Sequence, residues 1–232
     1  MCTSFVDKRD DLLIAMNFDN NGWEFNINTN NPNIFVIDVN TGYGKYPSFG
    51  INSNGIFINN LFVDSNGKGL YKRKSKTRTL TTYLINDILD ENIPIKDMDN
   101  YLDTMEIVNG PNQSTHNMIV DKNGNTWIIE PGRGYLKNGV KESQYYVMTN
   151  FSLIDFNGGK IYTDCGIDRY NEVNNLLSKA KKLNVNEAFK ILERVKQEGE
   201  WSTDFSMVYS KNNRAVYYCY KSNFNKILEY KF

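Results

Sequence analysis

The sequence predicts a layered α+β fold built mainly from antiparallel strands, on two observations. Strand-like segments are joined by several of seven Asn-Gly pairs, and Asn-Gly supplies the positive φ angles that hairpin turns need. Helical segments are few and are grouped between blocks of strands, which is unlike an alternating βαβ chain. No repeat, linker or low-complexity stretch divides the sequence, so we expect one domain over residues 1–232.

The expected strands are short apolar or alternating segments bounded by turn residues. The chain begins with a hairpin of two such segments around a polar turn. Two further hairpins turn at Asn54-Gly55 and Asn123-Gly124. The full set of expected strands is 3–6, 12–17, 34–38, 48–51, 55–63, 117–120, 126–130, 145–149, 206–209, 215–220 and 226–229.

Helices are predicted where apolar residues recur at a spacing of three or four. This spacing marks residues 79–91, 95–105 and, most clearly, 168–183. A further helix to about residue 197 should begin at Asn184, because Glu187 three positions later completes a capping box.

Composition excludes several classes of protein. The 27 basic and 27 acidic side chains cancel, which gives no electrostatic case for a nucleic-acid partner. No apolar run approaches the ~18 residues of a membrane span, and no signal segment opens the chain, so we expect a cytoplasmic protein. The three cysteines are odd in number and far apart, which argues against a disulfide framework or a zinc cluster. We expect no metal and no cofactor.

The residue composition affects how strongly a single side chain indicates a functional role. The chain has 34 asparagines and far more lysine than arginine, a pattern typical of an AT-rich coding bias and here taken as bacterial. One asparagine is therefore weak evidence for a role, and one arginine is stronger evidence. The single basic run, residues 72–78, is expected to be a solvated loop, with a patch for an anionic substrate or nucleic acid as the alternative.

Cys2 is the most informative position. Removal of the initiator methionine would leave one residue with both a thiol and a free α-amine. Because that amine has an unperturbed pKa near ~7.7–8.0, it can accept the thiol proton and later return it to a leaving group. Activation of a nucleophile by its own α-amine is an established solution.

An ordered set of motifs accompanies Cys2 along nearly the whole chain. They are Met1-Cys2-Thr3, Asn17-Phe18-Asp19, Gly50–Ile56, Thr115–Asp121 with Ile128–Glu130, Val147–Asn150, Arg169 at the start of the long helix, and a closing hairpin over Ser202–Tyr220. In this order and spacing the sequence resembles the choloylglycine hydrolase family of N-terminal-nucleophile hydrolases, which includes bile salt hydrolases and penicillin V acylases.

The resemblance implies a four-layer αββα sandwich and hydrolysis of a linear, non-peptide C–N amide bond. Cys2 would be the nucleophile, and Asp19 would accept a hydrogen bond from its amine. Asn150 would donate to the oxyanion, as would Asn60 or its neighbour Asn59; we take Asn60 as the candidate, and that choice stays open. The main-chain N–H there is an alternative donor.

Arg169 also stands out without the resemblance. A cation in the first turn of a helix opposes the helix dipole, and near Cys2 it would favour the thiolate. The family has an arginine directly before its Asn-x-Asp, where this chain has Met16.

Alternatives stay open at this stage. One is an acyltransferase on the same scaffold, and another is a non-catalytic small-molecule binder, for which the missing cation at Met16 argues. A papain-like set of Cys2, His116 and Asn150 is a third, although His116, the only histidine, is expected to be a hydrogen-bonded core imidazole. The expected partner is a small N-acyl amide, and assembly as a homo-oligomer stays open.

Overall fold

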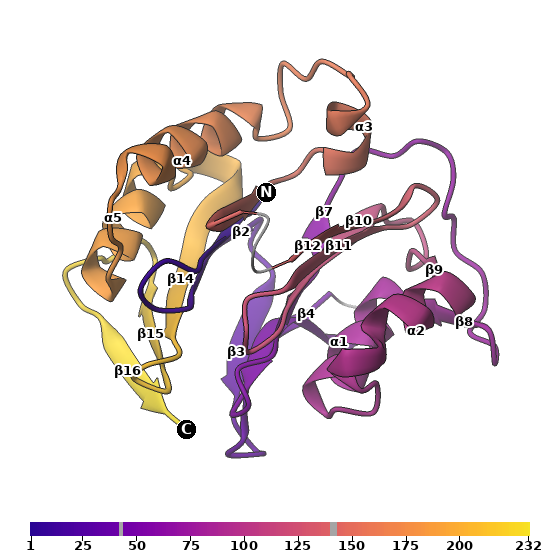
Figure 1. Ribbon diagram of the computed structural model, residues 1–232, viewed down its shortest axis with the longest axis horizontal. Helices are drawn as coiled ribbons and strands as arrows, with labels where there is room; N and C mark the ends of the chain where they lie inside the picture. Colours follow the sequence, from indigo (N-terminus) through magenta and orange to yellow (C-terminus); the bar gives the residue numbers. More distant parts are fainter. Residues whose placement is uncertain (42–43, 140–142) are drawn as a thin grey trace.

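The structure is a computed structural model that describes residues 1–41, 44–139 and 143–232. Figure 1 shows two large sheets facing each other, with α4 and α5 outside one sheet and α1 and α2 outside the other. This arrangement confirms the predicted α+β class and the αββα layering.

The first sheet has six antiparallel strands in the order β13-β1-β2-β14-β15-β16. The N-terminal hairpin thus lies at its centre, between strands from distant parts of the sequence. The bounds are β1 Thr3–Asp7, β2 Leu13–Asn20, β13 Tyr145–Met148, β14 Ser202–Ser210, β15 Ala215–Tyr220 and β16 Leu228–Lys231.

The second sheet has the order β12-β11-β10-β6-β5-β4-β3, with the short β7 also paired to β10. Its strands are β3 Glu24–Asn28, β4 Ile34–Asn40, β5 Lys45–Asn52, β6 Phe57–Asn59, β7 Leu61–Phe62, β10 Thr115–Val120, β11 Thr126–Glu130 and β12 Gly134–Asn138. A separate parallel pair joins β8 (Arg78–Leu80) to β9 (Glu106–Val108).

The helices are shorter than predicted. They are α1 Thr81–Leu89, α2 Met98–Thr104 after the 3₁₀ turn Ile95–Asp97, α3 Leu153–Asn157, α4 Ile167–Lys179, α5 Val185–Arg194 and a 3₁₀ turn Gly199–Trp201. Helix α4 ends at Lys179, before the predicted residue 183, and Leu183 reaches the same apolar cluster from the loop that follows. The capping box at Asn184 and Glu187 is present.

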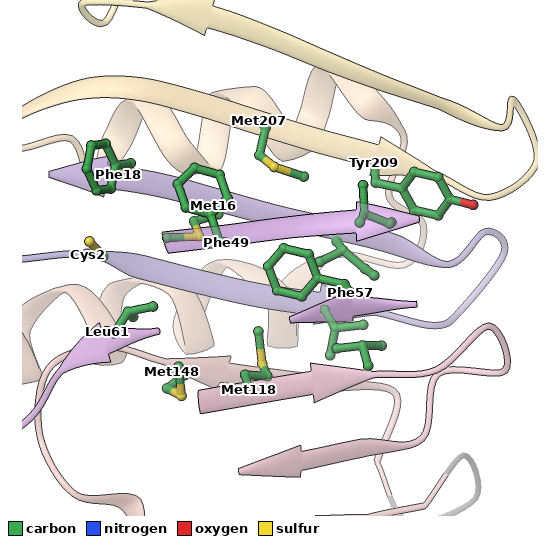
Figure 2. Close-up of a cluster of buried hydrophobic side chains, with 14 of the residues drawn as sticks. Cys2, Met16, Phe18, Phe49, Phe57, Leu61, Met118, Met148, Met207 and Tyr209 are labelled. Atoms are coloured by element: carbon green, nitrogen blue, oxygen red, sulfur yellow. The ribbon is translucent and has the colours of Figure 1, made fainter. Parts of the chain in front are cut away.

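Three apolar clusters fill the spaces between the four layers, as the period-2 alternation of strand side chains requires. Along β2, Ile14, Met16 and Phe18 face the second sheet, whereas Leu13 and Ala15 face α4 and α5. Figure 2 shows the cluster between the sheets, with Cys2 at one end of it. A third cluster packs α1 and α2 against the outer face of the second sheet.

Glycine at position 50 allows α1 to approach its sheet closely. A Cβ there would lie 2.8 Å from a Leu89 side-chain carbon and 2.8 Å from the Phe35 carbonyl oxygen.

No helix within the described ranges is long and apolar enough to cross a membrane.

Candidate active site

Cys2 directly precedes β1, and strand alternation decides which groups reach it. The Cys2 side chain belongs to the cluster between the sheets, while Thr3 follows it on β1 and bonds to a group from the helical layer. The site therefore has two sides: the thiol faces the space between the sheets, and the Arg169 guanidinium approaches from the helical layer.

Arg169 connects the elements of the helical side. Its Nη1 donates to the Cys2 carbonyl oxygen at 2.7 Å and to Thr3 Oγ1 at 2.7 Å, and it lies 3.5 Å from Asp19 Oδ2. Its Nη2 donates to Asn150 Oδ1 at 3.1 Å. One buried guanidinium thus contacts three of the other four predicted site residues.

The turn before α4 makes room for this guanidinium. Gly166 has φ +85°, and a Cβ at that position would lie 2.4 Å from Arg169 Nη2. Cys165, which also has a positive φ, accepts a hydrogen bond from the Asn150 main-chain N–H at 3.2 Å. Cys165 is partly exposed, whereas Cys219 is buried.

Asp19, at the end of β2, contacts Thr203 through one carboxylate oxygen and Arg169 through the other. Thr203 Oγ1 donates to its Oδ1 at 2.5 Å, because β14 pairs Thr203 with Asp19 in register. Burial raises the pKa of the Asp19 carboxyl to about 7, although the bond from Thr203 and the charge of Arg169 oppose that rise.

The amino terminus reaches the main chain of Asp19 and not its carboxylate. The α-amine, which belongs to Met1 in this structure, donates to the Asp19 carbonyl oxygen at 3.3 Å, and Cys2 Sγ lies 3.9 Å from the same oxygen. Burial lowers the pKa of this amine and raises the pKa of the Cys2 thiol to about 11. The buried thiol therefore needs a nearby base to lose its proton.

The two candidate oxyanion donors lie in different surroundings. Asn150 donates through Nδ2 to the Phe62 carbonyl at 2.7 Å, which uses one of its two amide protons. Asn60 lines the same pocket as Cys2, and among the described residues its side-chain amide has no acceptor. The Asn60 main-chain N–H is bonded to the Ser48 carbonyl at 2.9 Å.

Asn59 is the last residue of β6, and Asn60 lies between β6 and β7. Asn59 is fully buried, accepts a hydrogen bond from the Met118 N–H at 2.9 Å, and lies 4.0 Å from Met16 Sδ. Met16 is itself fully buried and places no charge near the thiol. Of these two asparagines, the structure thus places only Asn60 in the pocket.

The pocket that contains Cys2 has a volume of about 80 Å³, and its lining combines five aromatic side chains with aliphatic and polar ones. Asp19 is the one charged residue among the described residues that line it. Trp23 and Tyr46 form a half-exposed part of the wall. The aromatic and aliphatic lining residues are Phe18, Trp23, Val39, Tyr46, Pro47, Leu61, Phe62 and Trp201.

His116 does not contact Cys2. Its ring nitrogens lie 2.8 Å from the Thr149 carbonyl oxygen and 3.4 Å from Glu130 Oε1, which is the expected core position and does not support the papain-like set. The basic run 72–78 is largely exposed and forms surface ion pairs with Glu106 and Asp87.

Sequence reasoning missed the supporting groups Thr3, Thr203, Trp23 and Trp201. Thr3 was visible within the first motif, but the contact with Arg169 requires knowing which face of β1 meets α4. Thr203 could have been found only from the register of β2 against β14.

Comparison with known proteins gives a family and a fold. The model of the linear amide C-N hydrolases, choloylglycine hydrolase family, matches residues 9–157, which is well over half of the chain but leaves out Cys2 and Arg169. No curated protein sequence matches the chain.

Solved structures share the fold at low identity. The C2A mutant of the conjugated bile acid hydrolase from Clostridium perfringens is 14% identical, with a TM-score of 0.71 over 100% of this chain and 92% of that one. Penicillin V acylase from Agrobacterium tumefaciens is 14% identical, with a TM-score of 0.67 over 95% and 83%. The Caenorhabditis elegans ortholog of N-acylethanolamine-hydrolyzing acid amidase is 12% identical, with a TM-score of 0.62 over 90% and 93%.

Proposed function

Because this chain belongs to the choloylglycine hydrolase family of linear amide C-N hydrolases, we propose that it hydrolyses an N-acyl amide with Cys2 as the nucleophile. Loss of Met1 makes the Cys2 α-amine the base of the reaction. The observation that carries the proposal is the position of Arg169, which holds the Cys2 carbonyl, the Asp19 carboxylate and the Asn150 amide in one cluster.

The first half of the reaction forms an acyl-enzyme. The α-amine takes the thiol proton, Cys2 Sγ attacks the amide carbonyl carbon, and the carbonyl oxygen becomes an oxyanion. The resulting ammonium then gives its proton to the leaving nitrogen, the C–N bond breaks, and a thioester remains on Cys2. In the second half, water attacks the thioester, its proton passes through the amine to the departing thiolate, and the carboxylic acid leaves.

Arg169 and Asp19 keep the amine and the thiol in place. Removal of Met1 leaves the new ammonium on the residue whose carbonyl Arg169 already binds. An ionised Asp19 stabilises that ammonium, and Arg169 opposes the burial that raises the pKa of the Asp19 carboxyl. This positioning supports the proposed role of both residues.

Side-chain amides of Asn150 and Asn60 donate to the oxyanion. Asn150 keeps one amide proton free of Phe62, and Asn60 faces the pocket beside Cys2. Removing one such donor from an enzyme of this kind of chemistry costs about 3–4 kcal/mol of transition-state stabilisation.

The pocket indicates the chemistry of the acyl group. Its aromatic and aliphatic lining favours an uncharged apolar acyl group, and Met16 adds no cation behind it. Neighbours named for conjugated bile acid, for penicillin V and for N-acylethanolamine define the substrate panel.

The test is to incubate protein whose N-terminus is verified by mass spectrometry with this panel and to assay release of free amine. We expect turnover by protein that starts at Cys2, and none by Cys2→Ala or Cys2→Ser. Absence of turnover on every amide, with no acyl adduct on Cys2, would favour the non-catalytic binder, for which the buried, uncharged Met16 argues. Acyl transfer would be recognised by a new amide product when an acceptor amine is added.

A further inference from the structure

His116 lies in β10 and is completely buried. Its Nε2 is 2.8 Å from the carbonyl oxygen of Thr149, the residue that precedes Asn150. Its Nδ1 is 3.4 Å from Glu130 Oε1 at the end of β11. No step of the proposed reaction uses this ring.

Both groups that face the ring are acceptors. A carbonyl oxygen only accepts, and Glu130 Oε1 already accepts the Leu153 main-chain N–H at 2.8 Å. A neutral imidazole has one N–H and would leave one of these contacts as acceptor against acceptor. When Glu130 is ionised, both ring nitrogens face acceptors and each contact needs its own N–H, which makes His116 a cation paired with that carboxylate.

Glu130 binds the far end of the same segment. In addition to the Leu153 N–H, it accepts the hydroxyl of Ser152. Thr149 and Leu153 are thus fixed by one buried pair of side chains, and Asn150 lies between the two fixed points. From the other direction Asn150 contacts Arg169 and Phe62.

We propose that His116, as a buried imidazolium paired with Glu130, is a positioning residue that fixes the 149–153 segment and so aims the Asn150 amide at the oxyanion. This role rests on the proposed function of the site. It makes the only histidine of the chain part of the active-site framework without direct contact with the substrate.

The charges around the pair are consistent with an ionised carboxylate. Burial raises the pKa of the Glu130 carboxyl, but the hydrogen bond and charge of His116, with the bonds from Ser152 and Leu153, outweigh it and hold the pKa below its ordinary value. Arg133 Nε lies 3.9 Å from Glu130 Oε2, and Arg133 is in turn paired with Asp64 and Asp155.

The protonation state is tested by NMR of the imidazole nitrogens. Because the chain has one histidine, ¹⁵N-histidine labelling gives the signals of one ring. We expect both nitrogens to carry protons at pH 7.5, a state in which a free histidine is mostly neutral. A single neutral tautomer at that pH would overturn the proposal. This readout does not depend on turnover, so it stands even if the proposed function fails.

The positioning role is tested by three variants. His116→Ala removes both contacts, and we expect kcat to fall about 10- to 100-fold, as for a displaced catalytic group, with KM changed less than about twofold. His116→Gln places an amide N–H where Nε2 lies and should recover most of the lost kcat. Asn52→Ala removes buried hydrogen bonds to the Leu89 carbonyl and the Ile56 N–H and serves as the stability control.

All rates are referred to the folded fraction of each preparation, measured by urea unfolding, so that a loss of folded protein does not count as a loss of kcat. An effect of His116→Ala no larger than that of Asn52→Ala, or no recovery with His116→Gln, would overturn the positioning role.

Discussion

Arg169 donates to the carbonyl oxygen of Cys2 at 2.7 Å, although 167 positions separate the two residues. The contact joins the start of α4 to the start of β1 and forms a buried ion pair with Asp19 at 3.5 Å. A cation in the first turn of a helix is unfavourable by itself, and these partners compensate for its position.

Replacing Arg169 tests the cluster as a whole. Arg169→Met leaves the buried Cys2 carbonyl and Asn150 amide oxygens without their donor, at about 1–3 kcal/mol each, so we expect the free energy of unfolding to fall by about 2–6 kcal/mol. Arg169→Lys keeps the charge but cannot bond Cys2, Thr3 and Asn150 together, so activity should still fall at least about tenfold. Urea unfolding and kcat/KM measure the two effects.

The matched control is Arg194→Met. Arg194 forms a surface ion pair with Glu172, so we expect a change of no more than about 1 kcal/mol. Equal stability losses for the two Met variants would contradict the role of Arg169.

A Gly166 variant tests whether activity depends on the space that this glycine leaves for the Arg169 guanidinium. In Gly166→Ala the new Cβ would lie 2.4 Å from Arg169 Nη2, in addition to the cost of φ +85°. We expect at least about tenfold lower kcat/KM, since the guanidinium must move. Gly159→Ala is the control, because it has φ +97° but no atom within 4 Å of the new Cβ. Similar kinetics for both variants would show that backbone strain alone is responsible.

Alanine variants of Asn60 and Asn59 should separate an effect on catalysis from an effect on folding stability. We expect Asn60→Ala to lower kcat about 10²- to 10³-fold, as loss of an oxyanion donor does, with little change in unfolding free energy. Asn59→Ala leaves the Met118 N–H without its partner and should cost about 1–3 kcal/mol of stability instead. If Asn60→Ala retains full kcat, the donor must be another group.

The raised pKa of Asp19 predicts how stability depends on pH. Between its unfolded value of 3.8 and about 7, the folded chain holds a proton that the unfolded chain has released. Folding stability from this residue is therefore fully present below about pH 4 and is lost as pH rises to about 7, by roughly 4 kcal/mol in total.

The measurement compares unfolding free energies of the Met1-containing protein and its Asp19→Asn variant between pH 4 and 8. The difference should shift in favour of the variant as pH rises. A wild-type protein that instead gains stability relative to the variant over this range would mean that the Asp19 carboxyl has a lowered pKa.

Local signals predicted most of the framework. Asn-Gly turns and alternation gave the strands around Asn54-Gly55 and Asn123-Gly124, and the capping box gave the start of α5. Strands β3 and β12 were missed because they are polar or partly exposed edge strands with a weak apolar pattern. Helix α3 was missed because five residues are too few for a helical period.

Long-range register limited the prediction of the site. Motif order brought Cys2, Asp19, Asn150 and Arg169 onto one candidate site, and the structure places them together. Motif order in the sequence could not show that Thr203 reaches Asp19, or that Asn60 lines the pocket and Asn59 does not. Both facts depend on how the strands pair. The cytoplasmic location, the bacterial origin, assembly as a homo-oligomer and the extent of the domain stay predictions.

The proposed base is the α-amine of Cys2, and a matched pair of proteins tests this role directly. One is released by a protease so that it begins at Cys2, and the other keeps Met1; kcat/KM is measured for both on the best amide of the panel. We predict turnover by the first protein and a loss of at least about 10³-fold in the second, as expected when a general base is removed. Equal rates would contradict the claim.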